Sequence, residues 1–356
     1  MKVGIVTITE LDNFGNRLQN YALQEILKSL GCDVETIPNY ITYKYRKSKK
    51  YQLREFIHAI RVSNLKMKSE ILKQWRFERF DKKYFKFSKY YSTIDFISPE
   101  LNESYDFFVA GSDQIWNPYF PFNREFNFLV FADIEKRVAY SASFGVDDIP
   151  EDKKDLYKDY LRGMKSISVR EFAGQKIVNE LIGITVPVLP DPTLLLSKSE
   201  WCKVEKKPRW VKNDEDYILT YYLGDTAERN ELFGKLYSDF PTYKNSKIID
   251  INNIHNSKEY SINPSEFIYL IHHAKLMITD SFHGTVFSII MKTPYITVAR
   301  KDHGESMYSR IDSLYELLGL SSSKLICETH LSDQKHLDVL DEKKQEAIKY
   351  LQASLR

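Results

Sequence analysis

The sequence predicts an α/β protein in which two Rossmann-like domains face a cleft. Short apolar runs alternate with helical patterns along nearly all of the 356 residues, which is typical of parallel β-α units. A polar, charged stretch at 197–216 interrupts this alternation, so we expect it to link the two domains. Polar motifs follow several of the predicted strands, at the edge where open α/β sheets bind ligands.

The first domain is predicted to span 1–198, and its first unit is the clearest. A buried-strand pattern at 3–8 precedes a helical pattern at 18–30, which Gly31 ends. The remaining strands of this domain are expected at 34–37, 107–110, 137–141, 166–169 and 186–189.

The second domain is predicted to span 199–330 and repeats the same alternation. A final helical pattern at 341–355, within 331–356, is expected to pack back on the first domain. The strands of the second domain are expected at 217–223, 247–251, 276–279 and 295–299, and its helices at 227–238, 265–274 and 285–291.

A strongly basic insertion at about 44–90 departs from the average composition. Sixteen Lys or Arg face four acids between Lys44 and Lys89, with apolar residues interleaved at helical spacing. One or two amphipathic helices are therefore expected inside the first domain. Two interpretations remain open: a solvated helical hairpin, or a surface that rests on anionic lipid or binds a charged glycan.

Composition excludes several classes of protein. A net charge of +2 gives no general affinity for nucleic acid. The three cysteines, Cys32, Cys202 and Cys327, form no CxxC pair, which argues for a reducing compartment and against a zinc knuckle. No signal peptide or apolar stretch of bilayer length is present, so we expect a cytoplasmic protein. His272 and His273 have no carboxylate at ligand spacing, so no metal site is expected.

The richest candidate site lies at 276–288, where a strand ends and a helix follows. A helix N-terminus carries free N–H groups and a partial positive charge, so it attracts anions. His283 is the candidate general acid and base, with Asp280 orienting its ring and Ser281 and Gly284 beside a bound anion. The alternative is that His283 only caps the helix.

Three arginines are candidates for holding a carboxylate or a phosphate, because guanidinium groups bind both in bidentate fashion. Arg300 and Arg310 follow the last strand of the second domain, and Arg170 ends a strand of the first. The alternative for Arg170 is that it pairs with Glu171. Asp191, between two prolines, is as readily a turn residue.

A second set of polar residues suits a sugar. The segment 111–116 combines a turn with Asp113 as a candidate base, an amide and an indole for a sugar face. Polar residues also lie between the first strand and the first helix, where they contact substrate or cap the helix. The candidate acceptor-binding residues are Asn13, Asn16, Gln19, Gln114 and Trp116. GxGxxG, GxxxxGK[ST] and GxSxG motifs are absent, so dinucleotide and ATP binding have no support.

Seven motifs in order resemble the polysaccharide pyruvyl transferase family: NFGNRLQNYALQ, FVAGSDQIWNP, YSASFG, SVREFAG, VLPDPTLL, AKLMITDSFHGTVFS and YSRIDSLYELLGL. The basic insertion is the least family-like part. The resemblance implies a fold like the GT-B glycosyltransferase type, phosphoenolpyruvate as donor, a sugar acceptor and no cofactor. His283 matches the family's catalytic histidine and Arg170 its donor-binding arginine. Some members carry an arginine two residues before the histidine. Ser281 stands there in this chain, so Arg300 or Arg310 is expected to supply the charge.

The expected chemistry is ketal formation. An acid protonates the methylene carbon of the enol, one sugar hydroxyl attacks, and a second hydroxyl displaces phosphate. The resemblance places this reaction in the synthesis of capsular, exopolysaccharide or cell-wall glycans, with a polyprenyl-linked acceptor and a peripheral position at the inner membrane face among the expectations. Two alternatives remain: a nucleotide-sugar glycosyltransferase of the same two-domain plan, and a non-catalytic glycan-binding module.

Overall fold

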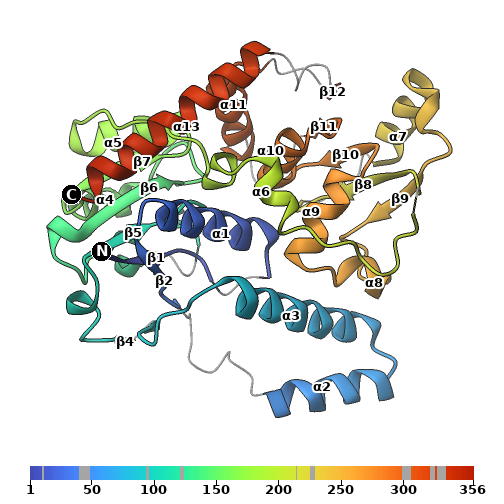
Figure 1. Cartoon of the computed structure of the whole chain (residues 1–356), viewed down its shortest axis with the longest axis horizontal. Coiled ribbons are helices and arrows are strands. Elements are labelled where there is room, and N and C mark those ends of the chain that lie inside the picture. Colours follow the sequence, from blue (N-terminus) through green and yellow to red (C-terminus); the bar gives the residue numbers. More distant parts are fainter. Residues whose placement is uncertain are drawn as a thin grey trace.

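The chain forms two parallel sheets, each flanked by helices, as Figure 1 shows. The computed structural model describes residues 1–9, 12–39, 49–93, 96–120, 124–213, 215–224, 229–298, 306–320, 325–326 and 334–356. This architecture confirms the predicted α/β class with two Rossmann-like halves. None of the helices in these ranges has the length and apolar character needed to cross a bilayer.

The first sheet has the order β2-β1-β5-β6-β7, and all its neighbours are parallel. Its strands are almost continuously buried because helices cover both faces. The strands are β1 (Lys2–Val6), β2 (Asp33–Thr36), β5 (Phe107–Ala110), β6 (Arg137–Ala142) and β7 (Ser166–Val169), and the helices are α1 (Phe14–Ser29), α4 (Lys154–Arg162) and α5 (Phe172–Ile182).

The second sheet has the order β12-β11-β10-β8-β9, parallel except for β12. A short helix, α6 (Lys198–Cys202), and a polar segment lead into it. Its strands are β8 (Tyr217–Tyr221), β9 (Lys247–Asp250), β10 (Leu276–Thr279), β11 (Tyr295–Thr297) and β12 (Leu325–Ile326), and its helices are α7 (Arg229–Asp239), α8 (Ser257–Tyr260), α9 (Pro264–His272), α10 (Phe282–Met291) and α11 (Ser306–Leu318).

Several predicted boundaries differ from the structure, and two of the differences bear on the elements around the site. The segment 186–189 is not a strand, because only Val188 pairs with Val169, as an isolated bridge. Pro187 within it has no N–H to donate to a ladder. Helix α10 begins at Phe282, three residues earlier than predicted, because the Ser281 hydroxyl accepts a hydrogen bond from the backbone N–H of Gly284 and caps it.

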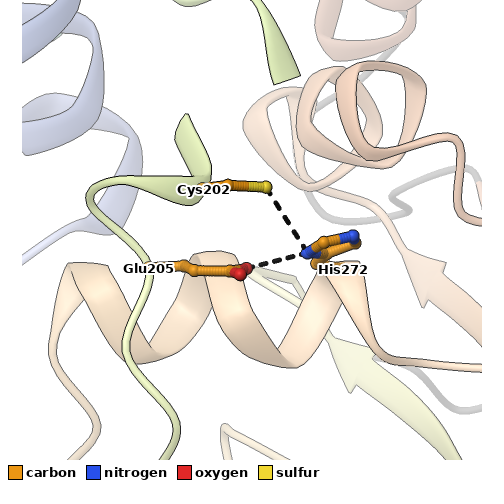
Figure 2. A group of neighbouring side chains, drawn as sticks. All are labelled: Cys202, Glu205 and His272. Atoms are coloured by element: carbon orange, nitrogen blue, oxygen red, sulfur yellow. Dashed lines mark hydrogen bonds and ion pairs between the residues drawn. The ribbon is translucent and has the colours of Figure 1, made fainter. Parts of the chain in front are cut away.

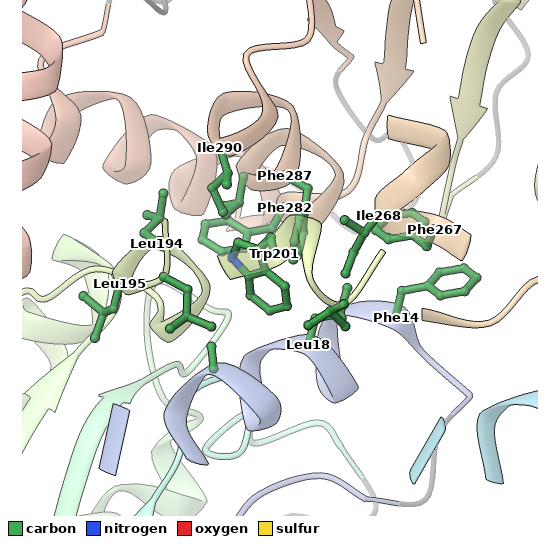
Figure 3. Packing of buried hydrophobic residues seen from close by; sticks show 14 of the residues in the cluster. Phe14, Leu18, Leu194, Leu195, Trp201, Phe267, Ile268, Phe282, Phe287 and Ile290 are labelled. Carbon is green, nitrogen blue, oxygen red and sulfur yellow. The ribbon is translucent and has the colours of Figure 1, made fainter. Parts of the chain in front are cut away.

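The two halves meet along a shared apolar layer, seen in Figure 3. Phe14 of α1 stacks on Phe267 of α9 with ring centroids 4.5 Å apart. Trp201 of α6 packs edge-on against Phe287 of α10. The halves are therefore in direct apolar contact beside the polar residues of the site.

The basic insertion forms two helices, α2 (Lys49–Arg61) and α3 (Leu65–Tyr84), followed by a small hairpin of β3 (Ser92–Thr93) and β4 (Phe96–Ile97). Helix α3 contacts both halves. Asp81 pairs with Arg17 of α1 at 2.9 Å, and Arg76 pairs with Glu266 of α9 at 3.1 Å. Helix α3 is thus part of the framework, whereas α2 lies on its outer side at the lower edge of Figure 1.

The C-terminal helix α13 (Gln334–Ser354) runs from the second half back to the first, along the upper edge of Figure 1. The Tyr350 hydroxyl donates a hydrogen bond to the carbonyl of Ala139 in β6 at 2.8 Å. Leu351 and Leu355 join the shared apolar layer.

Candidate active site between the two halves

His283 lies in the first turn of α10 and is only 7% exposed. The turn before it is fixed by Thr279, whose hydroxyl accepts a hydrogen bond from the backbone N–H of Ser281 at 3.0 Å. A side chain at Gly284 would lie 2.6 Å from that hydroxyl oxygen, so the turn requires glycine there. The sequence thus places the imidazole at a well-defined helix N-terminus.

Asp191 is the counter-ion of this histidine, with its Oδ2 atom 3.4 Å from Nε2 of His283. The same oxygen accepts hydrogen bonds from Nη1 of Arg170 at 2.9 Å and from the Ser112 hydroxyl at 2.7 Å. Oδ1 is held by the backbone and side chain of Thr193. Burial disfavours the charged carboxylate, but His283, Arg170 and the Thr193 hydrogen bond outweigh it and hold the pKa of Asp191 well below its ordinary value.

Gly15 lies against the other side of the imidazole. A Cβ atom built at Gly15 would collide with Nδ1 of His283, so the ring is held between this backbone and the Asp191 carboxylate. Gly15 is in the first turn of α1, next to Asn16, whose buried amide nitrogen has no hydrogen-bond partner within the described part of the chain. Two helix N-termini, those of α1 and α10, therefore meet at His283, and their partial positive charges favour an anion.

Arg170 adds a full positive charge from the first half and is 4% exposed. Its guanidinium carbon lies 4.3 Å from the ring centre of Phe282, the first residue of α10. Its Nη2 atom is buried and has no hydrogen-bond partner among the described residues, and its Nε atom lies 3.8 Å from the Glu171 carboxylate. This leaves a donor of Arg170 available for an anionic ligand.

The loop after β5 brings Asp113 and Gln114 to the same interface. Asp113 has a φ of 86°, and Ser141 at the end of neighbouring β6 has a φ of 49°; such strain in residues other than glycine collects at functional sites. Oδ1 of Asp113 accepts from the backbone N–H of Gln114, while Oδ2 is buried and forms no hydrogen bond with any residue that the structure describes. With its oxygen turned toward Arg310 of α11, the Gln114 amide accepts hydrogen bonds from both terminal nitrogens of that guanidinium.

The structure corrects the expectations for Trp116 and Asp280. Trp116 is fully buried, stacks on Phe128 and donates its indole N–H to the carbonyl of Asn127, so it has no face to offer a sugar. The Asp280 carboxylate accepts hydrogen bonds from the backbone N–H groups of Leu223 and Gly224 at 2.7 and 2.8 Å. Asp280 thus fixes the loop after β8, and it is Asp191 that lies beside the His283 ring.

The residues predicted near the first helix divide into two kinds. The Asn13 side chain caps α1 by accepting from the backbone N–H of Asn16. Gln19 is fully buried and donates to the Thr7 hydroxyl and the Asn16 carbonyl, so it supports the loop from within. Arg300 lies outside the described residues.

Sequence reasoning missed Asp191 as a counter-ion, and it missed Lys73 of α3. The Lys73 ammonium lies 5.1 Å from the ring centre of Phe14 and 4.9 Å from that of Tyr260. Burial lowers the pKa of Lys73, although the charge of Asp12 opposes the shift, and burial raises the pKa of Asp12. Nothing in the local sequence indicates that the insertion brings a cation to the start of α1.

One protein family matches this chain over most of its length. Residues 13–303 match the model of the family described as polysaccharide pyruvyl transferase. No curated protein matches the chain. Among solved structures, UDP-GlcNAc 2-epimerase from Neisseria meningitidis bound to UDP-GlcNAc is 10% identical, with 99% of this chain and 100% of that chain covered and a TM-score of 0.46.

Two further solved structures show a similar level of likeness. UDP-GlcNAc 2-epimerase from Methanocaldococcus jannaschii is 13% identical, with 96% and 92% covered and a TM-score of 0.48. HepE of Anabaena, in complex with UDP and glucose, is 8% identical, with 99% and 100% covered and a TM-score of 0.48. Likenesses this distant carry no argument about substrate. The family model, by contrast, spans most of the chain, from the cap of α1 past His283, and the chain belongs to the polysaccharide pyruvyl transferase family.

Proposed function

We propose that the protein transfers the pyruvyl group of phosphoenolpyruvate to two hydroxyls of one sugar and releases phosphate as a cyclic ketal forms. The observation that carries the proposal is the Asp191 carboxylate shared by His283 and Arg170 where two helix N-termini meet. This arrangement combines a proton donor with groups that attract anions. Phosphoenolpyruvate needs both, because its enol must be protonated while its carboxylate and phosphate are held.

Each residue then has a defined role. The imidazolium of His283 gives its proton to the methylene carbon, and Asp191 stabilises the charged ring beforehand. Arg170, through Nη2, and the partial positive charge at the N-terminus of α10 hold the anionic groups. Ser281 and Gly284 shape this N-terminus, because their N–H groups already donate to the hydroxyls of Thr279 and Ser281. The first sugar hydroxyl adds to the cationic carbon and loses its proton to Asp113. The second hydroxyl displaces phosphate and closes the ketal, and the departing phosphate takes the proton of that hydroxyl. The proton held by Asp113 returns to His283 through solvent, which restores both groups.

The location of the reaction is also part of the proposal. We place the protein in the cytoplasm, in the synthesis of a capsular, exopolysaccharide or cell-wall glycan on a polyprenyl-linked acceptor. Helix α2 supports a peripheral contact with an anionic bilayer, because Leu53, Ile57 and Ile60 are 51%, 41% and 53% exposed on one of its faces. Arg54 and Arg61 flank this face, which gives it the charge that anionic headgroups attract.

Donor protection and phosphate release test the proposal together. Phosphoenolpyruvate is expected to raise the melting temperature, whereas UDP- and GDP-sugars are not. With a lipid-linked or synthetic glycoside, phosphate should be released, and His283→Gln should lower turnover at least ~100-fold, the scale of a lost general acid. Stabilisation by a nucleotide-sugar alone would instead support a glycosyltransferase, and near-normal turnover of His283→Gln would remove the histidine from the mechanism.

A further inference from the structure

Three potential metal ligands converge on the side of the molecule where the segment between the halves meets α9 (Figure 2). Cys202 ends α6, Glu205 follows it in the connecting segment, and His272 ends α9. Nδ1 of His272 lies 3.8 Å from Sγ of Cys202 and 2.8 Å from Oε2 of Glu205. All three ligand atoms lie within 4.8 Å of one another.

Capping and buried side chains hold the backbone around Cys202 and Glu205 in place. The capping box of Ser197 and Glu200 fixes α6, and the buried side chains of Trp201 and Val204 anchor the backbone on either side of Cys202. Cys202, Glu205 and His272 are themselves half-buried, so solvent ions reach them. Sequence reasoning found no carboxylate for His272 because Glu205 is 67 positions away.

The set of donor atoms selects the metal. A thiolate, an imidazole and a carboxylate are the ligands that Zn²⁺ uses in proteins, whereas Ca²⁺ and Mg²⁺ prefer oxygen alone. Tetrahedral Zn²⁺ with ligand bonds of about 2.0 to 2.3 Å separates neighbouring donor atoms by about 3.3 to 3.6 Å. The sulfur–nitrogen distance of 3.8 Å is close to this range, and the nitrogen–oxygen distance of 2.8 Å has to widen by about half an ångström.

We propose that Cys202, Glu205 and His272 form a Zn²⁺ site that fastens the connecting segment to the second half. Water completes the coordination, or His273 does, whose Nε2 atom lies 4.0 Å from Oε1 of Glu205. Coordination requires the thiolate, so metal uptake releases the thiol proton to solvent. The site lies on different residues from the proposed transfer reaction and does not depend on it.

Cobalt binding to the full-length protein tests the proposal. Titration of the metal-free protein with Co²⁺ should produce the near-ultraviolet absorbance of a cobalt–thiolate bond, and Zn²⁺ should abolish it by displacement. Saturating Zn²⁺ should also raise the melting temperature, and a chelator should reverse the rise. Cys202→Ser should remove the thiolate absorbance, and Glu205→Gln and His272→Gln should weaken Zn²⁺ binding about 10-fold or more.

Cys32→Ser is the matched control, because Cys32 is buried in the shared apolar layer and is not one of the three converging ligands. It should leave the cobalt spectrum and Zn²⁺ affinity unchanged. Absence of the thiolate absorbance in the wild-type protein overturns the proposal, and so does Zn²⁺ affinity that Cys202→Ser leaves intact. In either case His272 and Glu205 form an ordinary hydrogen-bonded pair.

Discussion

At the scale of single residues, Asp191 organises the candidate site. It is fully buried between His283 and Arg170, which lie 113 positions apart in the sequence and belong to different halves of the molecule. A carboxylate in this position holds the Arg170 guanidinium and the His283 imidazole close together across the two halves. The local sequence LPDPT is that of a turn, so only the folded chain reveals the ion pairs.

Replacement of Arg170 should separate donor binding from acceptor binding. Arg170→Ala is expected to raise the KM for phosphoenolpyruvate about ten- to a hundred-fold, because a charge-assisted contact worth roughly 1.5–3 kcal/mol is lost. The KM for the sugar should change little. Steady-state kinetics with each substrate varied in turn measures both values.

Arg170→Lys and Arg162→Ala are the controls for that experiment. The first keeps the charge without the fork of donors and should fall between wild type and Arg170→Ala. The second removes an exposed arginine at the end of α4 and should change neither KM. An equal or larger effect of Arg170→Ala on the sugar would assign Arg170 to the acceptor.

The contact between Gly15 and His283 gives a steric prediction. Gly15→Ala places a methyl group in collision with Nδ1 of the imidazole, so the ring must leave its position between Gly15 and Asp191 or the halves must separate. Turnover is expected to fall at least ~10-fold, because small displacements of a catalytic group are costly. Phosphate release measures the loss.

Gly234→Ala is the matched control, since a side chain there meets nothing within 4 Å and lies inside helix α7. It should keep full turnover and stabilise the helix by up to about 1 kcal/mol. Unchanged turnover of Gly15→Ala would mean that the imidazole does not need the position seen in the structure.

At the scale of elements, the sequence predicts strands and long helices well, and boundaries and side-chain directions less well. The strands at 107–110, 166–169 and 276–279 agree with β5, β7 and β10, because buried parallel strands read as uninterrupted apolar runs. The segment 186–189 has the same apolar character, yet Pro187 prevents a ladder. Apolarity reports burial, but hydrogen-bonding capacity decides whether a buried segment becomes a strand.

The candidate site shows the same division. The positions of His283 and Arg170 at the interface are predictable because each follows a strand, at the sheet edge where open α/β sheets bind ligands, whereas their roles stay predictions. Trp116 is in an equally suggestive loop but faces the core, where Phe128 covers it. Asp191, rather than Asp280, lies beside the His283 ring. Local sequence patterns do not encode this contact, because it depends on packing between residues far apart in the sequence.

Helix α2 exposes an apolar face to solvent, and we expect the protein to bind anionic liposomes through it. Each basic residue near such a bilayer contributes about 1 kcal/mol, so binding should be salt-sensitive. The charge-reversal variant Lys47→Glu, Lys49→Glu, Lys50→Glu and Arg54→Glu should abolish it; Lys47 lies outside the described residues. Liposome co-sedimentation at low salt measures binding.

Exposed apolar residues allow a second test of the same surface. Leu53→Ser, Ile57→Ser and Ile60→Ser together should weaken liposome binding, because they remove the face that inserts. Leu156→Ser, on exposed α4, should have no effect. Activity on a short soluble acceptor should persist in every variant. Wild-type protein that stays in the supernatant would return α2 to the interpretation of a solvated helical face.

At the scale of the whole molecule, the halves are joined by an apolar layer and by buried charges, and only the charges respond to pH. The pKa of Asp191 is depressed in the folded state, so its contribution to stability is present above the unfolded value of about 3.9 and is lost as the pH falls further. Wild-type stability should therefore decline with acidification below about pH 4.

Asp191→Asn isolates this contribution. At neutral pH the variant should lose about 3–5 kcal/mol of unfolding free energy, because Arg170 is left buried without its carboxylate. Below about pH 4 its stability should depend less on pH than that of the wild type. Urea denaturation across this range measures both. Asp148→Asn, at an exposed site, should match the wild type, and an Asp191→Asn variant with the wild-type acid response would contradict the depressed pKa.

The division of the site between the halves has a consequence for the hydrolysis of phosphoenolpyruvate by water. His283 and Phe282 belong to the second half, whereas Asp191, Arg170 and Gly15 belong to the first. If the halves move apart, His283 loses its contact with Asp191, and Arg170 loses its contact with the Phe282 ring in the same movement. Under the proposed function, a separated molecule can hold neither the donor nor the charge needed to activate it, so futile hydrolysis of phosphoenolpyruvate by water is avoided until the closed arrangement forms.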